Sequence, residues 1–301
     1  MSVQGTERGR TRGSEAPGRV RTVTSSPIQS DPLELIDSWP VPNCAAGWTN
    51  ITGNLSKRGD AEKVFPIASL TKPLVALAIL VAVEEGSLGL DTHAGPPGST
   101  IRHLLAHASG LGPEDSNPVA APGSRRIYSN SGYEALGHAL ETATDMSVST
   151  YFDEAVSQPL GLRATKILGS PAHGAVSTVT DLLGVVAELL APTILAPETM
   201  SAATTVQFSE LDGVLPGYGR QSPNQWGLGF EIRGNKHPHW TAATNSPATF
   251  GHFGRSGTMI WIDPSLGVGC VALTDREFGP WAVESWPALG AAIIENSTFV
   301  A

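Results

Sequence analysis

The sequence predicts an α+β fold, in which helices flank an antiparallel sheet that is assembled from both ends of the chain. Strand-like segments occur near residues 43–59 and again after residue 225. The intervening stretch instead shows helical patterns joined by Gly- and Pro-rich loops. Strands on both sides of a helical stretch favour α+β over alternating βαβ units.

The first block of the chain predicts a hairpin followed by a long buried helix. An extended stretch over residues 43–51 meets Gly53 and Asn54, which are typical of a tight turn. The apolar run over residues 74–83 then predicts a helix, and Gly86 is suited to the left-handed position that ends one.

The middle of the chain predicts short helices. One is expected over residues 100–107, and Ser131 with Glu134 has the spacing of a capping box. Two further helix starts are expected at the pairs Thr150–Asp153 and Thr178–Asp181.

The last block returns to strands. Apolar residues alternate over residues 226–232, which predicts a half-buried strand. Two further strands and a final helix beginning at Pro287 are expected at residues 257–263, 267–274 and 287–295.

These patterns suggest three regions in a chain long enough for one large domain or two joined ones. We expect a disordered leader at residues 1–31, because this stretch is rich in Arg, Gly and Ser and has few apolar residues. Residues 32–91 and 172–301 should form the sheet with its flanking helices, and residues 92–171 should form a helical region packed beside it.

The charge distribution narrows the class of partner. The net charge is −9, but residues 1–31 carry five Arg against three acidic residues, so the remainder carries −11. Such an acidic body argues against nucleic-acid or membrane-surface binding. No apolar core follows the arginines, and the run at 74–83 is too short to span a bilayer. We therefore expect a cytoplasmic protein that acts on a small molecule.

Ser69 and Lys72 stand at the start of the apolar helix. Three residues apart on a helix, their side chains share one face, so an amine could accept the proton of the serine hydroxyl. The chain has five lysines, and only Lys72 has a serine three positions before it. A solvated lysine at a helix start is the competing interpretation.

Two later motifs complete a candidate site. In an extended segment, Tyr128 and Asn130 point the same way and could enter one cleft. The run from Gly251 to Gly257 contains His252-Phe253-Gly254-Arg255 at a strand entry, where glycines permit close approach of a substrate. Taken singly, the first of these motifs is better explained as a loop that anchors a helix start, and the second as a bulge or turn.

Together, the three motifs resemble those of the serine β-lactamase and penicillin-binding-protein superfamily, particularly its class C β-lactamase-like branch. The resemblance extends over residues 32–296, through segments such as Thr100 to Leu111 and Trp261 to Pro264. It implies a β-lactamase/transpeptidase-like fold. It also implies that Ser69 is the acylated nucleophile, Lys72 its proton partner and Tyr128 the general base or acid.

The resemblance further implies a set of substrate-binding residues. Asn130 would hold a substrate amide, and His252, Phe253 and Gly254 would form the third motif. The N–H groups of Ser69 and Arg255 would form the oxyanion hole, as the family places them.

Histidine stands in the third motif where carboxylate-binding β-lactamases usually have lysine. Because histidine is mostly uncharged near neutral pH, we expect a preference for neutral esters over penicillins. We also expect penicillin acylation to improve as the pH falls through the usual imidazole pKa. Arg255 is an alternative carboxylate ligand, although its backbone is expected to matter more.

The sequence therefore predicts an intracellular serine esterase or amidase whose partner is a small ester, amide or lactam. The alternatives are a true β-lactamase or D,D-peptidase, and a non-catalytic penicillin-binding sensor or scaffold. We expect no cofactor and no metal. His103 and His107 lack the glutamate of a metalloprotease helix, and His237 and His239 lack a third ligand.

Overall fold

The computed structural model describes residues 31–115 and 117–297. The predicted leader at residues 1–31 lies outside this part except for Asp31. The Asp31 carboxylate accepts a hydrogen bond from the backbone N–H of Leu33 at 3.0 Å and caps the 3₁₀ helix η1 (Pro32–Ser38). Within these residues, no helix combines the length and apolar character needed to cross a membrane.

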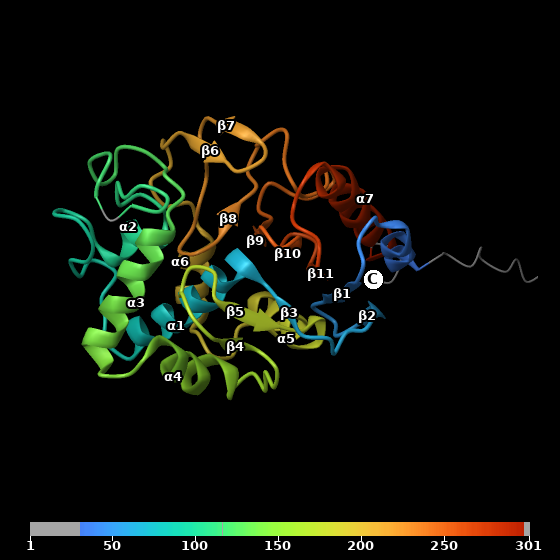
Figure 1. The fold of residues 1–301 in the computed structure, drawn as a ribbon, viewed down its shortest axis with the longest axis horizontal. Helices are drawn as coiled ribbons and strands as arrows, with labels where there is room; N and C mark the ends of the chain where they lie inside the picture. The colour runs from blue at the N-terminus through green and yellow to red at the C-terminus, as the bar shows by residue number, and fades with distance from the viewer. Residues whose placement is uncertain (1–30, 116, 298–301) are drawn as a thin grey trace, which may run out of the picture. The chain divides into compact units, whose positions relative to one another are not determined.

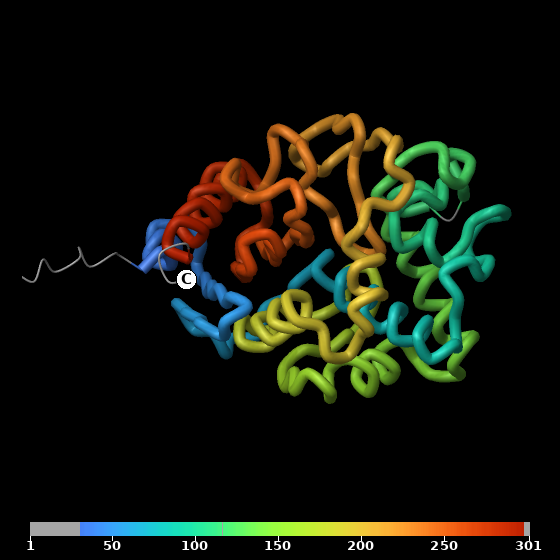
Figure 2. The backbone as a smooth tube through the Cα atoms, turned by 180° about the vertical axis from the view of Figure 1, so that it is seen from behind, coloured from blue at the N-terminus to red at the C-terminus, as the bar shows by residue number. Residues whose placement is uncertain are grey.

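The main sheet of the described residues has six strands in the order β2-β1-β11-β10-β9-β8, all paired antiparallel. These strands are β1 (Cys44–Asn50), β2 (Leu55–Gly59), β8 (Glu231–Ile232), β9 (Phe250–Gly254), β10 (Thr258–Asp263) and β11 (Val268–Thr274). Figure 2 shows the first strands, in blue, beside the last, in red and orange. The α+β prediction, with a sheet built from both ends of the chain, is confirmed.

Helices cover both faces of this sheet. Helix α5 (Val179–Leu190) packs on one face, against β1, β10 and β11, and α7 (Pro280–Ser297) lies on the other with η1 (Figure 1). Side chains alternate between the two layers: Ile260 and Ile262 of β10 join the core on the α5 side, whereas Met259 and Trp261 join the core on the α7 side. Burial on both faces explains why β10 reads as a continuous apolar run.

The remaining elements surround the helix that follows the nucleophile motif. Helix α1 (Thr71–Glu84) is apolar on all sides and packs against α3 (Asn130–Thr144) and α4 (Val148–Phe152). The other elements are β3 (Phe65–Pro66), η2 (Ala68–Leu70), α2 (Ile101–Leu105), the π-helix η3 (Asp153–Ser157), β4 (Lys166–Ile167), β5 (Ala175–Ser177), α6 (Pro197–Thr204), β6 (Gly213–Leu215) and β7 (Gly219–Gln221).

The predicted helical region at residues 92–171 contains α2, α3, α4 and η3. Its strand β4 pairs with β5, which in turn pairs with β3 just before the nucleophile motif. Residues 31–297 form part of one compact unit. The boundaries expected for the helical region and the sheet-forming region remain predictions.

Several predicted elements are confirmed. Gly53 adopts a positive φ of 85° in the turn between β1 and β2, and Gly86 follows α1 with φ 79°. The Thr178 side chain caps α5 by accepting from the backbone N–H of Asp181 at 3.1 Å. The hairpin of β10 and β11 lies where residues 257–263 and 267–274 predict it.

Two predicted helix starts are wrong because an earlier serine makes the cap. Ser129, not Ser131, caps α3: its extended backbone lets its Oγ accept from the Gly132 N–H at 2.9 Å. Likewise Ser147, rather than Thr150, caps α4 and accepts from the Thr150 N–H at 3.1 Å. Both true caps lie two or three residues before the predicted ones.

Three further boundaries differ from the prediction. Helix α2 ends at Leu105, because His107 adopts a left-handed φ of 54°. The expected strand over residues 226–232 is reduced to β8, since the Gly227 N–H donates to Phe230 O at 2.8 Å and closes a turn. Helix α7 begins at Pro280 and not at Pro287. Proline suits the first position of a helix, because the backbone N–H there makes no bond within the helix. Pro287 therefore lies inside the helix.

Candidate active site

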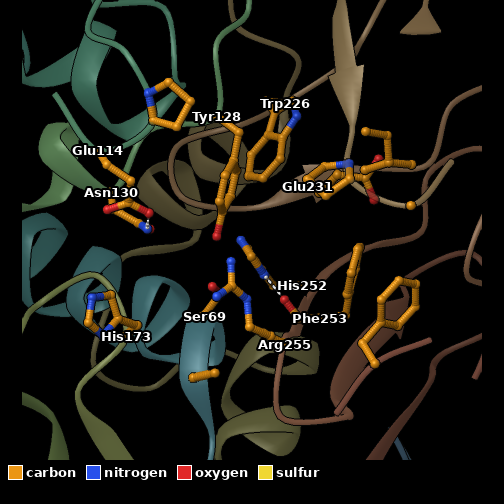
Figure 3. Close-up of a pocket in the computed structure, with 16 residues that line it drawn as sticks. Ser69, Glu114, Tyr128, Asn130, His173, Trp226, Glu231, His252, Phe253 and Arg255 are labelled. Carbon is orange, nitrogen blue, oxygen red and sulfur yellow. Dashed lines mark hydrogen bonds between the residues drawn. The ribbon is translucent and has the colours of Figure 1, made fainter. Parts of the chain in front are cut away.

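A cavity of about 470 Å³ brings the three sequence motifs together (Figure 3). Its wall includes the predicted residues Ser69, Tyr128, Asn130, His252, Phe253 and Arg255. It also includes residues that were not predicted, among them Glu114, His173, Trp226, Glu231 and Phe278. Lys72 lies behind this wall, in hydrogen-bond contact with Asn130.

Ser69 lies in the short 3₁₀ helix η2, between strand β3 and helix α1. The residue before it, Ala68, has a left-handed φ of 45°, a strained conformation for a residue with a side chain. This bend turns the chain sharply into α1 and leaves Ser69 half-buried on the cavity wall. Strained backbone, such as that of Ala68 next to Ser69, is common at functional sites.

The Lys72 side chain is fully buried in the first turn of α1. Its Nζ donates to Asn130 Oδ1 at 2.6 Å and to Ala172 O at 2.9 Å. It forms no hydrogen bond to Ser69 Oγ in the structure. Burial lowers the pKa of Lys72 to about 7, although Glu114 and Glu134 oppose part of the shift. A large share of the molecules therefore has a neutral amine at neutral pH.

Tyr128 faces Ser69 from the end of the loop before α3. Burial raises the pKa of its phenol well above the usual value, and the nearby Ser69 side chain opposes part of that rise. The phenol therefore keeps its proton at neutral pH. Lys72 Nζ lies 4.6 Å from the centroid of the Tyr128 ring, so Tyr128 lies close to both residues of the first motif.

Asn130 is the first residue of α3, and its carboxamide is fully engaged. Oδ1 accepts from Lys72, while Nδ2 donates to Glu114 Oε1 at 2.6 Å. As predicted, Asn130 and Tyr128 line the same cavity. The Asn130 amide joins the buried amine to an exposed carboxylate at the cavity rim.

The third motif, on β9, lies directly against the nucleophile segment. Thr258 Oγ1, on the neighbouring strand β10, donates to Ile67 O at 3.0 Å. A Cβ on Gly254 would stand only 2.6 Å from Ile67 O and 3.2 Å from the Ala68 Cβ. Glycine is therefore required at 254 for β9 to approach η2 this closely.

His252 is buried, and its ring is neutral. Burial lowers its pKa to about 3, and the nearby Lys72 contributes in the same direction. The expected titration of His252 through the usual imidazole pKa is therefore wrong, because desolvation moves it below the pH range from 5 to 8. Figure 3 shows one ring nitrogen bonded to Phe253 O and the other pointing toward the Tyr128 hydroxyl.

The other third-motif residues have different surroundings. Phe253 packs into an aromatic group with ring-centroid distances of 4.9 Å to Phe278 and 5.8 Å to Trp240. Arg255 is exposed at the cavity, and forms no salt bridge with any described residue. Its guanidinium is therefore free to meet an incoming substrate.

A buried ion cluster that no sequence motif predicted lies beside His252; it consists of Glu231, Lys236 and His239, with Trp240 as a further hydrogen-bond donor. The Glu231 carboxylate accepts from Lys236 Nζ, from His239 Nε2 at 2.9 Å and from Trp240 Nε1 at 2.9 Å. Burial alone would raise the pKa of Glu231, but His239 and Lys236 lower it, so the carboxylate is ionised. The available signal was that all three partners of Glu231 lie within nine positions of it in the sequence.

His107, for which the sequence did not support a metal-binding role, lies behind the second motif. Its Nδ1 accepts from the backbone N–H of Ser129 at 3.2 Å, and its ring lies 4.7 Å from that of Tyr128. His103 instead contacts Thr100 Oγ1. Among the residues that the structure describes, no three His, Cys, Asp or Glu side chains cluster as a metal site would require.

A half-buried serine near a buried amine, packed against strands β9 and β10 of an antiparallel sheet, defines the chain as a serine hydrolase. Residues 45–293 match the protein family described as Beta-lactamase. The chain belongs to this family.

Individual relatives agree with this assignment. A β-lactamase from Mycobacterium bovis has a crystal structure with a TM-score of 0.88 and 50% identity, covering 89% of this chain and 100% of that one. Esterase EstB from Burkholderia gladioli is 25% identical over 72% of this chain and 78% of its own length. Penicillin-binding protein 4* from Bacillus subtilis is 32% identical over 35% of this chain, which spans 31% of that protein. The predicted superfamily and its β-lactamase/transpeptidase-like fold are confirmed.

Proposed function

We propose that this hydrolase is an esterase that forms an acyl-enzyme on Ser69 from small neutral esters, with amides as weaker substrates. The neutral, buried His252 carries the proposal. A lysine at this position would offer a fixed charge to a substrate carboxylate, whereas this imidazole offers none. Glu114 at the rim adds a negative charge that disfavours an anionic substrate.

The proposed reaction starts with a neutral Lys72 amine and a protonated Tyr128 phenol. Ser69 Oγ attacks the ester carbonyl carbon as its proton passes to the neutral Lys72 amine. The backbone N–H groups of Ser69 and Arg255 stabilise the oxyanion that forms. Tyr128, protonated at neutral pH, gives a proton to the leaving alcohol. These steps leave Lys72 protonated and Tyr128 as a phenolate. Water then attacks the acyl-enzyme and gives a proton to the Tyr128 phenolate, and Lys72 returns its proton to Ser69 Oγ as the acid is released.

Intact-protein mass spectrometry tests this proposal. The chain is mixed with a series of p-nitrophenyl esters and, separately, with a penicillin, while product release is followed by absorbance. We expect a transient acyl adduct from the esters that is absent in Ser69→Ala, and little adduct from penicillin. The exposed Ser149→Ala variant is the control and should retain turnover. Near-wild-type turnover by Ser69→Ala would refute the assignment.

A β-lactamase or D,D-peptidase is the second candidate, and Arg255 favours it. Its exposed guanidinium at the cavity could bind a penicillin carboxylate in place of the third-motif lysine. In that case wild type would turn over penicillin faster than esters, and Arg255→Ala would remove the difference. An adduct that forms but never hydrolyses would instead favour the non-catalytic sensor.

We also propose that the enzyme works in the cytoplasm. Its two cysteines, Cys44 and Cys270, are both unpaired, as is usual in a reducing compartment. Fractionation of the producing cells, with the ester hydrolysis that Ser69→Ala abolishes as readout, tests this. Activity in the culture medium or the membrane fraction would contradict it.

A further inference from the structure

One hydrogen bond fixes the proton arrangement of the His252 imidazole. Its Nδ1 lies 2.7 Å from the backbone carbonyl oxygen of Phe253. Because a carbonyl oxygen only accepts hydrogen bonds, Nδ1 must carry the hydrogen. A neutral imidazole carries one N–H group, so Nε2 presents a lone pair.

This Nε2 lone pair is buried in the wall of the cavity that His252 lines, and it has no partner among the described residues. Neighbouring aromatic rings hold the imidazole in place: the Tyr128 ring lies 5.7 Å away and the Trp226 ring 5.6 Å away. In Figure 3 the nitrogen points toward the Tyr128 hydroxyl. A buried acceptor that lacks a donor costs free energy, which a ligand with a donor would recover.

The charges around His252 keep the lone pair available. Lys72 opposes protonation of the ring, and Glu231 favours it. The Glu231 carboxylate is, however, already engaged with Lys236, His239 and Trp240. Neither group takes the place of a ligand donor at Nε2.

We infer that the site selects esters that bear a neutral hydrogen-bond donor, a hydroxyl or an amide N–H, opposite His252 Nε2. This inference rests on the proposed esterase function and names its substrate class. A carboxylate would place its own lone pairs against that of Nε2, and an alkyl or methoxy group would leave the buried acceptor unpaired.

Two matched pairs of esters test the inference on either side of the scissile bond. On the acyl side, the p-nitrophenyl esters of 3-hydroxybutyrate and 3-methoxybutyrate are compared. On the alcohol side, 2-hydroxyethyl and 2-methoxyethyl butyrate are compared. In wild type, kcat/KM should favour the hydroxyl member of at least one pair by about 3- to 10-fold, as one hydrogen bond to a neutral acceptor would give.

Variants assign that preference to His252. In His252→Leu the ratio of hydroxyl to methoxy ester should fall to about 1, whereas His252→Gln, whose amide oxygen accepts, should keep part of it. His138→Leu is the matched control, because His138 is exposed on α3 and does not line the cavity. Its ratio should match wild type.

A second measurement is independent of turnover. The ¹⁵N chemical shifts of the His252 ring should show a protonated Nδ1 and an unprotonated Nε2 from pH 5 to 8. Absence of any ester acylation would refute the esterase proposal, but the ring spectrum would still test the acceptor. The inference is overturned by a protonated Nε2, by ratios near 1 for both pairs in wild type, or by an unchanged ratio in His252→Leu.

Discussion

Lys72 Nζ donates a 2.6 Å hydrogen bond to Asn130 Oδ1 and so joins two motifs that lie 58 residues apart in the chain. The same Asn130 amide donates to Glu114 at the cavity rim. The buried amine is thus linked through one side chain to an exposed carboxylate. A substrate amide that replaced Lys72 on Asn130 would leave the amine free for Ser69, which would couple substrate binding to proton transfer.

The pKa of Lys72 predicts the pH dependence of ester hydrolysis. Because the pKa is lowered to about 7, the amine is mostly protonated at pH 5 and mostly neutral at pH 8. The value of kcat/KM for a neutral ester should therefore rise about tenfold per pH unit below pH 7 and level off above it. A stopped-assay pH profile from pH 5 to 9 measures this.

Lys72→Arg is the companion variant for that profile. Arginine keeps the positive charge but does not lose its proton at these pH values, so kcat/KM should fall at least 100-fold across the range. Lys166→Arg, at a partly exposed surface salt bridge, is the control and should leave the profile unchanged. A wild-type profile that still rises steeply from pH 8 to 9 would mean that Lys72 retains an ordinary pKa.

The pKa of His252 predicts that discrimination against penicillin is constant with pH. Since burial and Lys72 lower this pKa to about 3, despite the opposing charge of Glu231, the ring stays neutral from pH 5 to 8. The ratio of kcat/KM for a penicillin to that for a short ester should therefore not change in this range. Steady-state kinetics of both substrates at each pH give the ratio, and an increase toward pH 5 would contradict the neutral ring.

His252→Lys should raise that penicillin-to-ester ratio about tenfold, because a charge-assisted hydrogen bond to the carboxylate is stronger than a neutral one. His173→Lys places the same charge at an exposed position on the cavity wall and serves as the control. An equal gain in both variants would show that general attraction, rather than the third-motif position, controls penicillin recognition.

His107 is expected to stabilise the second motif. His107→Phe keeps a ring against Tyr128 but leaves the buried Ser129 N–H without its acceptor, so the free energy of unfolding should fall by about 1–3 kcal/mol. Urea unfolding measures this, and kcat/KM should fall as well. His107→Asn should lose less stability, because asparagine tolerates the left-handed backbone at this position. His138→Phe, on the exposed side of α3, should be neutral; equal losses at 107 and 138 would refute the role.

Gly254 should tolerate no side chain. In Gly254→Ala the new Cβ would lie 2.5 Å from Thr258 Oγ1 and 2.6 Å from Ile67 O, so β9 must move away from η2. We expect a loss of about 1–3 kcal/mol in unfolding free energy and a marked fall in kcat/KM. Gly169→Ala is the control, since no atom lies within 4 Å of a Cβ there. Wild-type stability and activity in Gly254→Ala would show that the motif segments are not tightly packed.

The sequence alone predicted those features that depend on local pattern. Gly53 specified the first hairpin, and the apolar run after Lys72 specified the buried helix, because turn chemistry and side-chain periodicity act over a few residues. The order of the motifs containing Ser69, Tyr128 and His252 sufficed for the family and for a shared cleft. Local reasoning was least accurate where two capping residues compete, as with Ser129 and Ser131.

Only the tertiary structure decided the state of the site. The sequence contains a histidine at 252, but its neutrality depends on burial and on the nearby Lys72, and its tautomer on the carbonyl of Phe253. Glu231 became a buried ion only because the fold carries Lys236 and His239 to it. Desolvation arises from packing between segments that are distant along the chain, and the same packing sets the backbone geometry that forms the short-range hydrogen bonds, so no local pattern encodes either.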